Sequence, residues 1–274
     1  MNELQKAVSR RRFMAGVGTL GLSATAGLLL SGCGGSSSSS TNQDATIINA
    51  AATAEALATV MYDNIIKSAV YTSGLNENAN DQAYLVAGRE QEALHYQVLV
   101  GAGAQPLALT FYFPIGMFTT ANGQQNAQTV VNTLITLEDA FIAAYLIGIR
   151  DLSTSALKVL AGQILGVESE HRTLGRVIAA DLGLTSVTGL SGTPESVVGA
   201  SGHAANNIAF ERTFSTTGPK FQTINDVVKA LGPFVTPPTS GSGFDPTPYQ
   251  FNTTANFYLT ETPTVTLDST TPNS

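Results

Sequence analysis

The chain has 274 residues, one cysteine and an excess of acidic over basic groups that gives a formal net charge of −7. This composition excludes a disulfide-stabilised scaffold and a basic nucleic-acid-binding surface, so we expect no nucleic acid among the partners. The length accommodates one large domain or two small ones.

The first 33 residues have the features of an export signal with an attachment point for lipid. Residues 9–14 read Ser-Arg-Arg-Arg-Phe-Met, which is typical of a twin-arginine signal, and the apolar segment 15–30 is too short for a lasting membrane span. The segment ends in Leu-Ser-Gly-Cys, which resembles a bacterial lipobox with Cys33 as the lipidated residue. The alternative is an ordinary cleavage site beside a coincidental cysteine. We expect export by the twin-arginine route to the periplasm or cell envelope, with membrane contact only through lipid on Cys33.

A Ser-rich linker over residues 34–43 follows the signal. Without residues 1–33 the chain holds nine basic and nineteen acidic residues, a net charge of about −10. The sequence therefore predicts a soluble acidic body on a flexible tether.

Apolar residues that recur at steps of three and four predict helices over residues 44–70, 81–103, 124–150 and 155–181, with Asp44 as the N-cap of the first. The connection over residues 101–122 is rich in Gly, Pro and aromatic residues and is long enough to cross a bundle from end to end. The expected fold is all-α: a four-helix bundle over residues 44–185, built from two helical hairpins and a long crossover.

Residues 186–274 have a different composition, dominated by Ser, Thr, Gly and Pro. Short helices are expected over residues 204–214 and 223–235, the second of them amphipathic. The irregular remainder carries four aromatic residues after position 248. We expect this C-terminal extension to wrap around the bundle, at least in part.

Each of the four predicted helices places ionisable side chains on its apolar stripe. The first and third helices each carry Glu-x6-Tyr, and the second and fourth each carry Glu-x-x-His, which indicates an internal duplication. The pairs are Glu55 with Tyr62, Glu92 with His95, Glu138 with Tyr145, and Glu168 with His171.

Charges on a core stripe are costly unless something neutralises them. Two divalent cations carry four positive charges, which four carboxylates cancel, while each imidazole supplies a neutral ligand. The neighbouring acids Glu90, Asp139 and Glu170 are expected to point away from this set, toward a solvated face or the rim of the bundle. Tyr62 and Tyr145 either support the site through hydrogen bonds or radical chemistry, or are ordinary core tyrosines with satisfied hydroxyls.

At the level of these motifs the chain resembles the ferritin-like superfamily, whose bundles contribute one Glu from each of two helices and Glu-x-x-His from each of the others. The segments Leu-Glu-Asp-Ala-Phe at residues 137–141 and Ala-Asn-Asn-Ile-Ala-Phe-Glu-Arg at residues 205–212 are similar to exported ferritin-like and desiccation-related bacterial proteins, and the resemblance covers about residues 44–215. It implies six metal ligands, with Glu92 and Glu168 as the bridging ones. These are Glu55, Glu92, His95, Glu138, Glu168 and His171.

The resemblance further implies two bound iron ions and oxidation of Fe(II) by O2 or hydrogen peroxide, in a ferroxidase-like or peroxidase-like cycle that serves oxidative or desiccation stress. Manganese in place of iron, with catalase-like activity, is one alternative. Another is a structural or metal-sequestering stress protein without turnover, which the long extension favours. Metal ions and the oxidant are thus the expected partners, together with a possible second copy of the chain in a homodimer.

Overall fold

The computed structural model describes residues 38–73, 75, 79–118, 124–184, 186–188, 194–196 and 221–260. The predicted export signal with Cys33 and the predicted helix over residues 204–214 lie outside these residues.

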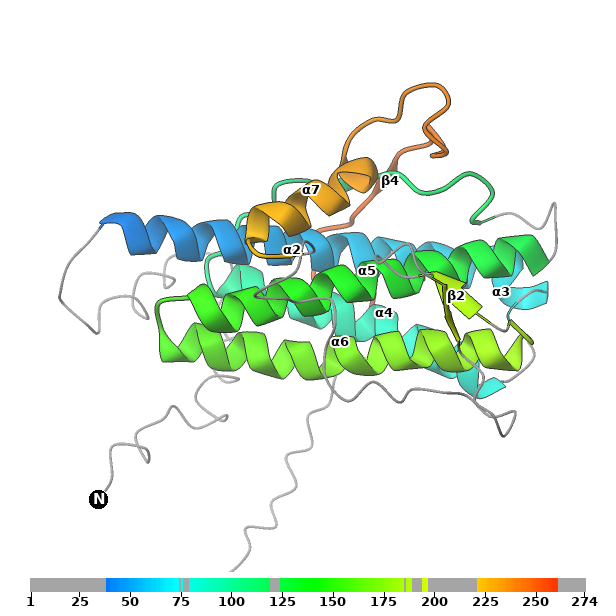
Figure 1. The fold of residues 1–274 in the computed structure, drawn as a ribbon, viewed down its shortest axis with the longest axis horizontal. Helices are drawn as coiled ribbons and strands as arrows, with labels where there is room; N and C mark the ends of the chain where they lie inside the picture. Colours follow the sequence, from blue (N-terminus) through cyan, green and yellow to red (C-terminus); the bar gives the residue numbers. More distant parts are fainter. Residues whose placement is uncertain are drawn as a thin grey trace, which may run out of the picture.

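Four long helices form an elongated bundle (Figure 1). Helix α2 packs along α4, and α5 packs along α6, so each consecutive pair is a helical hairpin. The predicted all-α bundle of two hairpins and a crossover is confirmed. The four helices are α2 (Ser38–Lys67), α4 (Ala79–Gly101), α5 (Gln124–Asp151) and α6 (Ser155–Asp181), and a short α3 (Ala69–Ser73) follows α2.

The crossover between the hairpins contains strand β1 (Thr110–Phe111), which pairs antiparallel with β4 (Tyr249–Gln250) near the end of the described chain. Backbone groups of a buried connection need partners, and β4 supplies them. Phe111 is fully buried at this point. A second small ladder joins β2 (Ser186–Thr188) to β3 (Pro194–Ser196). The sequence pattern predicted neither ladder, because strands of two or three residues have no detectable period.

Helix α7 (Ile224–Val235) forms where the sequence predicts a short amphipathic helix. Its first turn is closed by a capping box between Thr223 and Asp226. The helix packs against α2 and α5 (Figure 1). With α4 and α5 beside it and α7 above it, α2 is buried on every side over residues 50–63, as expected for a helix that is apolar all round.

The last described segment wraps around the outer face of α4. The ring of Phe251 lies against Tyr96, with 4.4 Å between ring centroids. Farther along, the backbone N–H of Thr260 donates to Glu90 at 2.9 Å. The expectation that the C-terminal extension covers the bundle holds for these residues.

The predicted start of the first helix is wrong. Helix α2 begins at Ser38, so the last six residues of the predicted linker are helical, and Asp44 lies inside the helix. The Asp44 carboxylate accepts hydrogen bonds from the backbone N–H of Ser153 at 2.8 Å and from its hydroxyl at 2.5 Å. Asp44 thus ties α2 to the turn between α5 and α6, a distant partner that local sequence does not show.

Helix α5 is long and apolar enough to cross a membrane when judged by length and composition alone. However, 83% of the relevant window is buried within the bundle. Its hydropathy is therefore that of a core helix, and no other helix in the described part of the chain meets the same criteria.

Two glycines of α6 provide a test of helix packing. A Cβ atom on Gly175 would lie 2.7 Å from Leu134 Cδ2 and 2.9 Å from Ile135 Cγ1, whereas one on Gly166 would meet nothing within 4 Å. Gly175→Ala is expected to lower the free energy of unfolding by about 1–2 kcal/mol, because overpacking outweighs the gain in helix propensity.

Gly166→Ala, the matched control, is expected to raise the free energy of unfolding by about 0.5–1 kcal/mol. Chemical denaturation of the two variants measures both changes. Equal shifts in the same direction would contradict the close α5–α6 contact at Gly175.

Candidate metal centre

The predicted ligands come together in the middle of the bundle. Glu-x-x-His places its two side chains one turn apart on the same helix face, and the hairpin pairing brings the four faces together. All four glutamates are completely buried. Helix α2 contributes Glu55, α4 contributes Glu92 and His95, α5 contributes Glu138, and α6 contributes Glu168 and His171.

The ligand atoms form two overlapping sets, each with its atoms within 4.8 Å of one another. One set contains Glu55 and His95, the other contains Glu138 and His171, and both include Glu92 and Glu168. Each set is large enough to hold one metal ion. The two shared carboxylates, Glu92 and Glu168, are the ones that the resemblance implies as bridging or near-bridging ligands.

The donor atoms of this cluster lack other partners. Both carboxylate oxygens of Glu92 and Glu168, Oε2 of Glu138 and Nδ1 of His171 are buried without a hydrogen-bond partner among the described residues. Glu92 Oε1 lies 2.8 Å from His171 Nδ1, yet the two are not aligned as a hydrogen bond. Buried polar atoms are rarely left unsatisfied, and divalent cations at the two positions would satisfy these. The residues therefore fit a pair of divalent metal ions with oxygen and nitrogen ligands.

Both histidines present Nδ1 to the carboxylates. His95 Nδ1 lies 3.1 Å from Glu168 Oε1 and 3.2 Å from Glu55 Oε2. His171 Nδ1 lies 3.5 Å from Glu168 Oε2, in addition to its approach to Glu92. Glu168 is thus flanked by both imidazoles, one on each side.

The two tyrosines hold carboxylates of the cluster. The Tyr62 hydroxyl donates to Glu138 Oε1 at 2.8 Å, and the Tyr145 hydroxyl donates to Glu55. Each tyrosine therefore binds the glutamate of the partner helix and not the glutamate of its own helix. Within one helix, seven residues separate the tyrosine from the glutamate by about 10 Å along the axis. Because α2 and α5 run antiparallel, each tyrosine lies beside the glutamate of the neighbouring helix. Of the two interpretations open from sequence, direct support of the site is the one observed.

A glycine creates the space for Tyr62. A Cβ atom on Gly88, one turn before Glu92 in α4, would lie 3.1 Å from Tyr62 Cε1 and Cζ. The Tyr62 ring also meets the His171 ring edge-on, with 5.8 Å between centroids. The close approach of α4 to Tyr62 thus fixes where the hydroxyl points.

Burial and mutual repulsion set the protonation of the metal-free cluster. Burial raises the pKa of Glu92 and Glu138 well above the usual range, and the charge of Glu168 adds to this. Burial acts in the same sense on Glu168, but the close approach and positive charge of His171 and His95 outweigh it and lower the pKa of that carboxyl.

The histidines and tyrosines respond to the same carboxylates. Burial alone would lower the pKa of His171, yet the nearby carboxylates of Glu168 and Glu138 raise it to about 9. His95 shifts in the same direction, chiefly because of Glu55. Burial and the neighbouring carboxylates also raise the pKa of Tyr62 and Tyr145, which therefore remain neutral hydrogen-bond donors.

Of the three acids predicted to point outward, Glu170 is exposed and Glu90 is half-buried beneath Thr260. The expectation for Asp139 is wrong: it is buried and forms an ion pair with Arg172 at 3.3 Å. Asp139 directly follows Glu138, and Arg172 directly follows His171. The close packing of α5 on α6 buries this pair beside the cluster.

One residue beside the cluster was not singled out from the sequence. Gln91 of α4 places its side-chain oxygen 2.8 Å from Nε2 of His171 on α6. Its position directly before Glu92 is the only local signal, and nothing in the sequence links it to His171.

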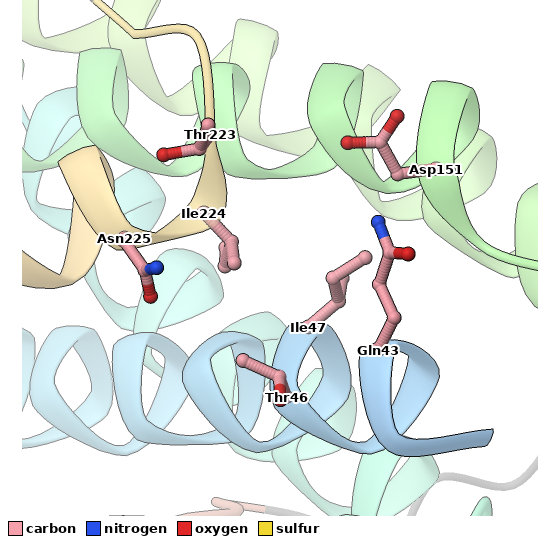
Figure 2. A pocket seen from close by; sticks show the side chains of 7 residues that line it. All are labelled: Gln43, Thr46, Ile47, Asp151, Thr223, Ile224 and Asn225. Carbon is pink, nitrogen blue, oxygen red and sulfur yellow. The ribbon is translucent and has the colours of Figure 1, made fainter. Parts of the chain in front are cut away.

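A surface hollow among the described residues lies elsewhere. It has a volume of about 390 Å3 and opens where the start of α7 meets the first turns of α2 and the end of α5 (Figure 2). Ile47 and Ile224 project into it, and Asp151 is the one ionisable residue of its lining. Gln43 lies about 18 Å from Glu55 along α2 at 1.5 Å per residue. The hollow is therefore separate from the carboxylate cluster.

Comparison with protein families agrees with this geometry. The family model described as a ferritin-like domain matches residues 43–180, half of the chain and the whole of the bundle. The chain belongs to the ferritin-like domain family. The ferritin-like match ends at α6, so the C-terminal extension lies outside it. Comparison with curated proteins gives no match.

The raised pKa of His171 predicts how pH affects this ferritin-like protein when metal is removed. A histidine with a folded-state pKa of about 9 and an ordinary value of 6.5 contributes stability that is complete below pH 6.5 and is lost as the pH rises to about 9. The raised pKa values of Glu92 and Glu138 act in the same direction. Between pH 6.5 and 9 we expect the chelator-treated protein to lose about 2–3 kcal/mol of stability.

Thermal unfolding at several pH values, with and without added divalent metal, measures this loss. The metal-loaded protein is expected to keep its Tm, because neutral imidazoles and ionised carboxylates bind metal more tightly as the pH rises. His171→Gln should reduce the pH dependence of the chelator-treated protein. A metal-free protein equally stable at both pH values would contradict the electrostatics described for the cluster.

Proposed function

We propose that this ferritin-like protein binds two iron ions in the carboxylate cluster and oxidises Fe(II), with O2 or hydrogen peroxide as the oxidant. The observation that carries the proposal is the pair of overlapping ligand sets, whose shared Glu92 and Glu168 lack hydrogen-bond partners in the described structure. Four carboxylates and two imidazoles match the charge and ligand preference of two iron ions.

A bound pair of Fe(II) ions would supply two electrons, one from each ion, at neighbouring positions. Two Fe(II) ions give up two electrons, which, with two protons, convert hydrogen peroxide to two molecules of water or O2 to hydrogen peroxide. The carboxylates stabilise the additional positive charge that this oxidation produces. The surrounding apolar bundle limits the access of water and strengthens that electrostatic interaction.

The two tyrosines maintain the geometry of the cluster. Tyr62 and Tyr145 hold Glu138 and Glu55 by hydrogen bonds, so each of these carboxylates has one oxygen committed and the other directed to the cluster. Such outer contacts orient ligands and maintain their basicity. We assign to both tyrosines the role of hydrogen-bond donors during turnover.

We also propose that the protein is exported by the twin-arginine route and attached to the cell envelope through lipid on Cys33. At the envelope it acts under oxidative or desiccation stress. The motif in residues 9–14 and the Leu-Ser-Gly-Cys sequence support this. Mass spectrometry of the membrane fraction tests it: a diacylated peptide beginning at Cys33 is expected, and an unmodified cysteine would contradict the anchor.

Glu168 and Glu170 provide a matched test of the metal centre, because they lie two residues apart on α6, one completely buried and one exposed. The wild-type protein is expected to bind two equivalents of iron and to oxidise added Fe(II) faster than buffer alone. Glu168→Ala removes a ligand shared by both positions and is expected to abolish both properties, whereas Glu170→Ala should retain them. Elemental analysis and aerobic Fe(II) oxidation measure these outcomes.

The same measurements separate the competing functions. Two bound equivalents with no oxidation above the buffer rate would identify a metal-sequestering protein. Manganese in the purified protein together with release of O2 from hydrogen peroxide would identify catalase-like activity. Undiminished metal in Glu168→Ala would contradict the site itself, provided that circular dichroism shows the variant to be folded.

A further inference from the structure

The two halves of the cluster differ in how their histidines are held. Nε2 of His171 lies 2.8 Å from the side-chain oxygen of Gln91, while Nδ1 of the same ring faces the carboxylates of the cluster. By the spacing of the duplicated motif, the residue that corresponds to Gln91 is the one before Glu168, and it is Val167. Valine has no hydrogen-bond acceptor in its side chain.

The two histidine side chains also differ in their exposure to solvent. The His171 side chain is 4% exposed, and that of His95 is 13% exposed. Among the described residues, the hydrogen-bond partner of His95 is Glu55, which lies beside Nδ1 of the ring. The His95 ring thus lies at the more exposed end of the cluster.

Tautomer selection follows from the contact with Gln91. A neutral imidazole carries its proton on one nitrogen and offers a lone pair on the other, and the hydrogen bond made by the first nitrogen decides which is which. The Gln91 oxygen accepts a hydrogen bond from Nε2–H, which leaves the Nδ1 lone pair directed at the carboxylates. His171 is therefore held ready as a ligand, whereas in the described part of the chain Nε2 of His95 has no corresponding acceptor.

From this asymmetry we infer that Gln91 is a positioning residue that makes the two metal positions unequal in affinity. The position formed by Glu138 and His171 binds the first metal ion tightly. The position formed by Glu55 and His95 binds the second ion, which is exchangeable. The inference rests on the proposed metal centre. It adds that incoming Fe(II), as substrate, is captured at the His95 position while the ion beside His171 stays in place.

A metal titration without iron oxidation tests this inference. Zn(II) is added to the chelator-treated protein in competition with a chromophoric chelator, and the affinities of the first and second equivalents are compared. The wild-type protein is expected to bind the first equivalent at least about tenfold more tightly than the second, since outer hydrogen bonds to a ligand histidine typically change metal affinity by about 10- to 100-fold.

Substitutions of Gln91 identify the cause. Gln91→Leu removes the acceptor at similar volume and is expected to weaken the tight equivalent by about 10- to 100-fold. Gln91→Glu keeps an acceptor at the same place and should retain most of the difference between the equivalents. The reciprocal variant, Val167→Gln, introduces an amide at the corresponding position of the other half and is expected to strengthen the second equivalent.

Two further measurements assign the equivalents to their histidines. His95→Ala should retain the tight equivalent, and His171→Ala should lose it. In the Zn(II)-loaded wild-type protein, nuclear magnetic resonance should show a slowly exchanging Nε2 proton on His171. Loss of its protection in Gln91→Leu, with the fold intact, reports the hydrogen bond directly.

Equal affinities for both equivalents in the wild type, or an unchanged tight equivalent in Gln91→Leu, would overturn the inference. Failure of the proposed function has a different signature. Two unequal Zn(II) equivalents in a protein that does not oxidise Fe(II) would overturn the oxidase function and leave the assignment of Gln91 standing.

Discussion

Burial of four carboxylates in the centre of an apolar bundle is the constraint on which this structure depends. Each of these glutamates is fully buried, and an isolated charge in such surroundings costs several kcal/mol even after relaxation. Without metal, the cluster reduces this cost by retaining protons on Glu92 and Glu138 and by charging its histidines. Divalent cations would remove the same cost and make it part of the binding free energy.

The two helical hairpins contribute equally to the buried cluster. Each hairpin contributes one single glutamate and one Glu-x-x-His, and the antiparallel contact of α2 with α5 exchanges tyrosines between the halves. The exchange gives Glu55 and Glu138 equivalent hydrogen bonds. Departures from this symmetry are therefore informative. Gly88 and Gln91 both lie on α4, and together they fix the surroundings of His171, whereas the motif in α6 has Ile164 and Val167 at the corresponding positions.

Residues outside the ferritin-like match complete the core. Helix α7 lies over α2 and α5, and the β1–β4 ladder ties the crossover to the extension. As a result, α2 is buried on all sides next to Glu55, which keeps water away from that carboxylate. The small residues of α2 suit this position, because alanines allow α4, α5 and α7 to approach its backbone closely.

Local sequence determined the helices and the identity of the residues that form the buried cluster. Period-3.6 apolar stripes locate all four long helices, and glutamate and histidine on those stripes stand out because charge is rare there. The ends of the helices were predicted less accurately. Asp44 resembles an N-cap in the sequence, but its carboxylate accepts hydrogen bonds from Ser153 in the turn between α5 and α6. Contacts between helices were decided only by the tertiary structure: the exchange of tyrosines, the burial of Asp139 with Arg172, and the hydrogen bond from His171 to Gln91. Each joins residues more than 30 positions apart, and a helix's sequence carries no record of which neighbour its polar atoms will meet.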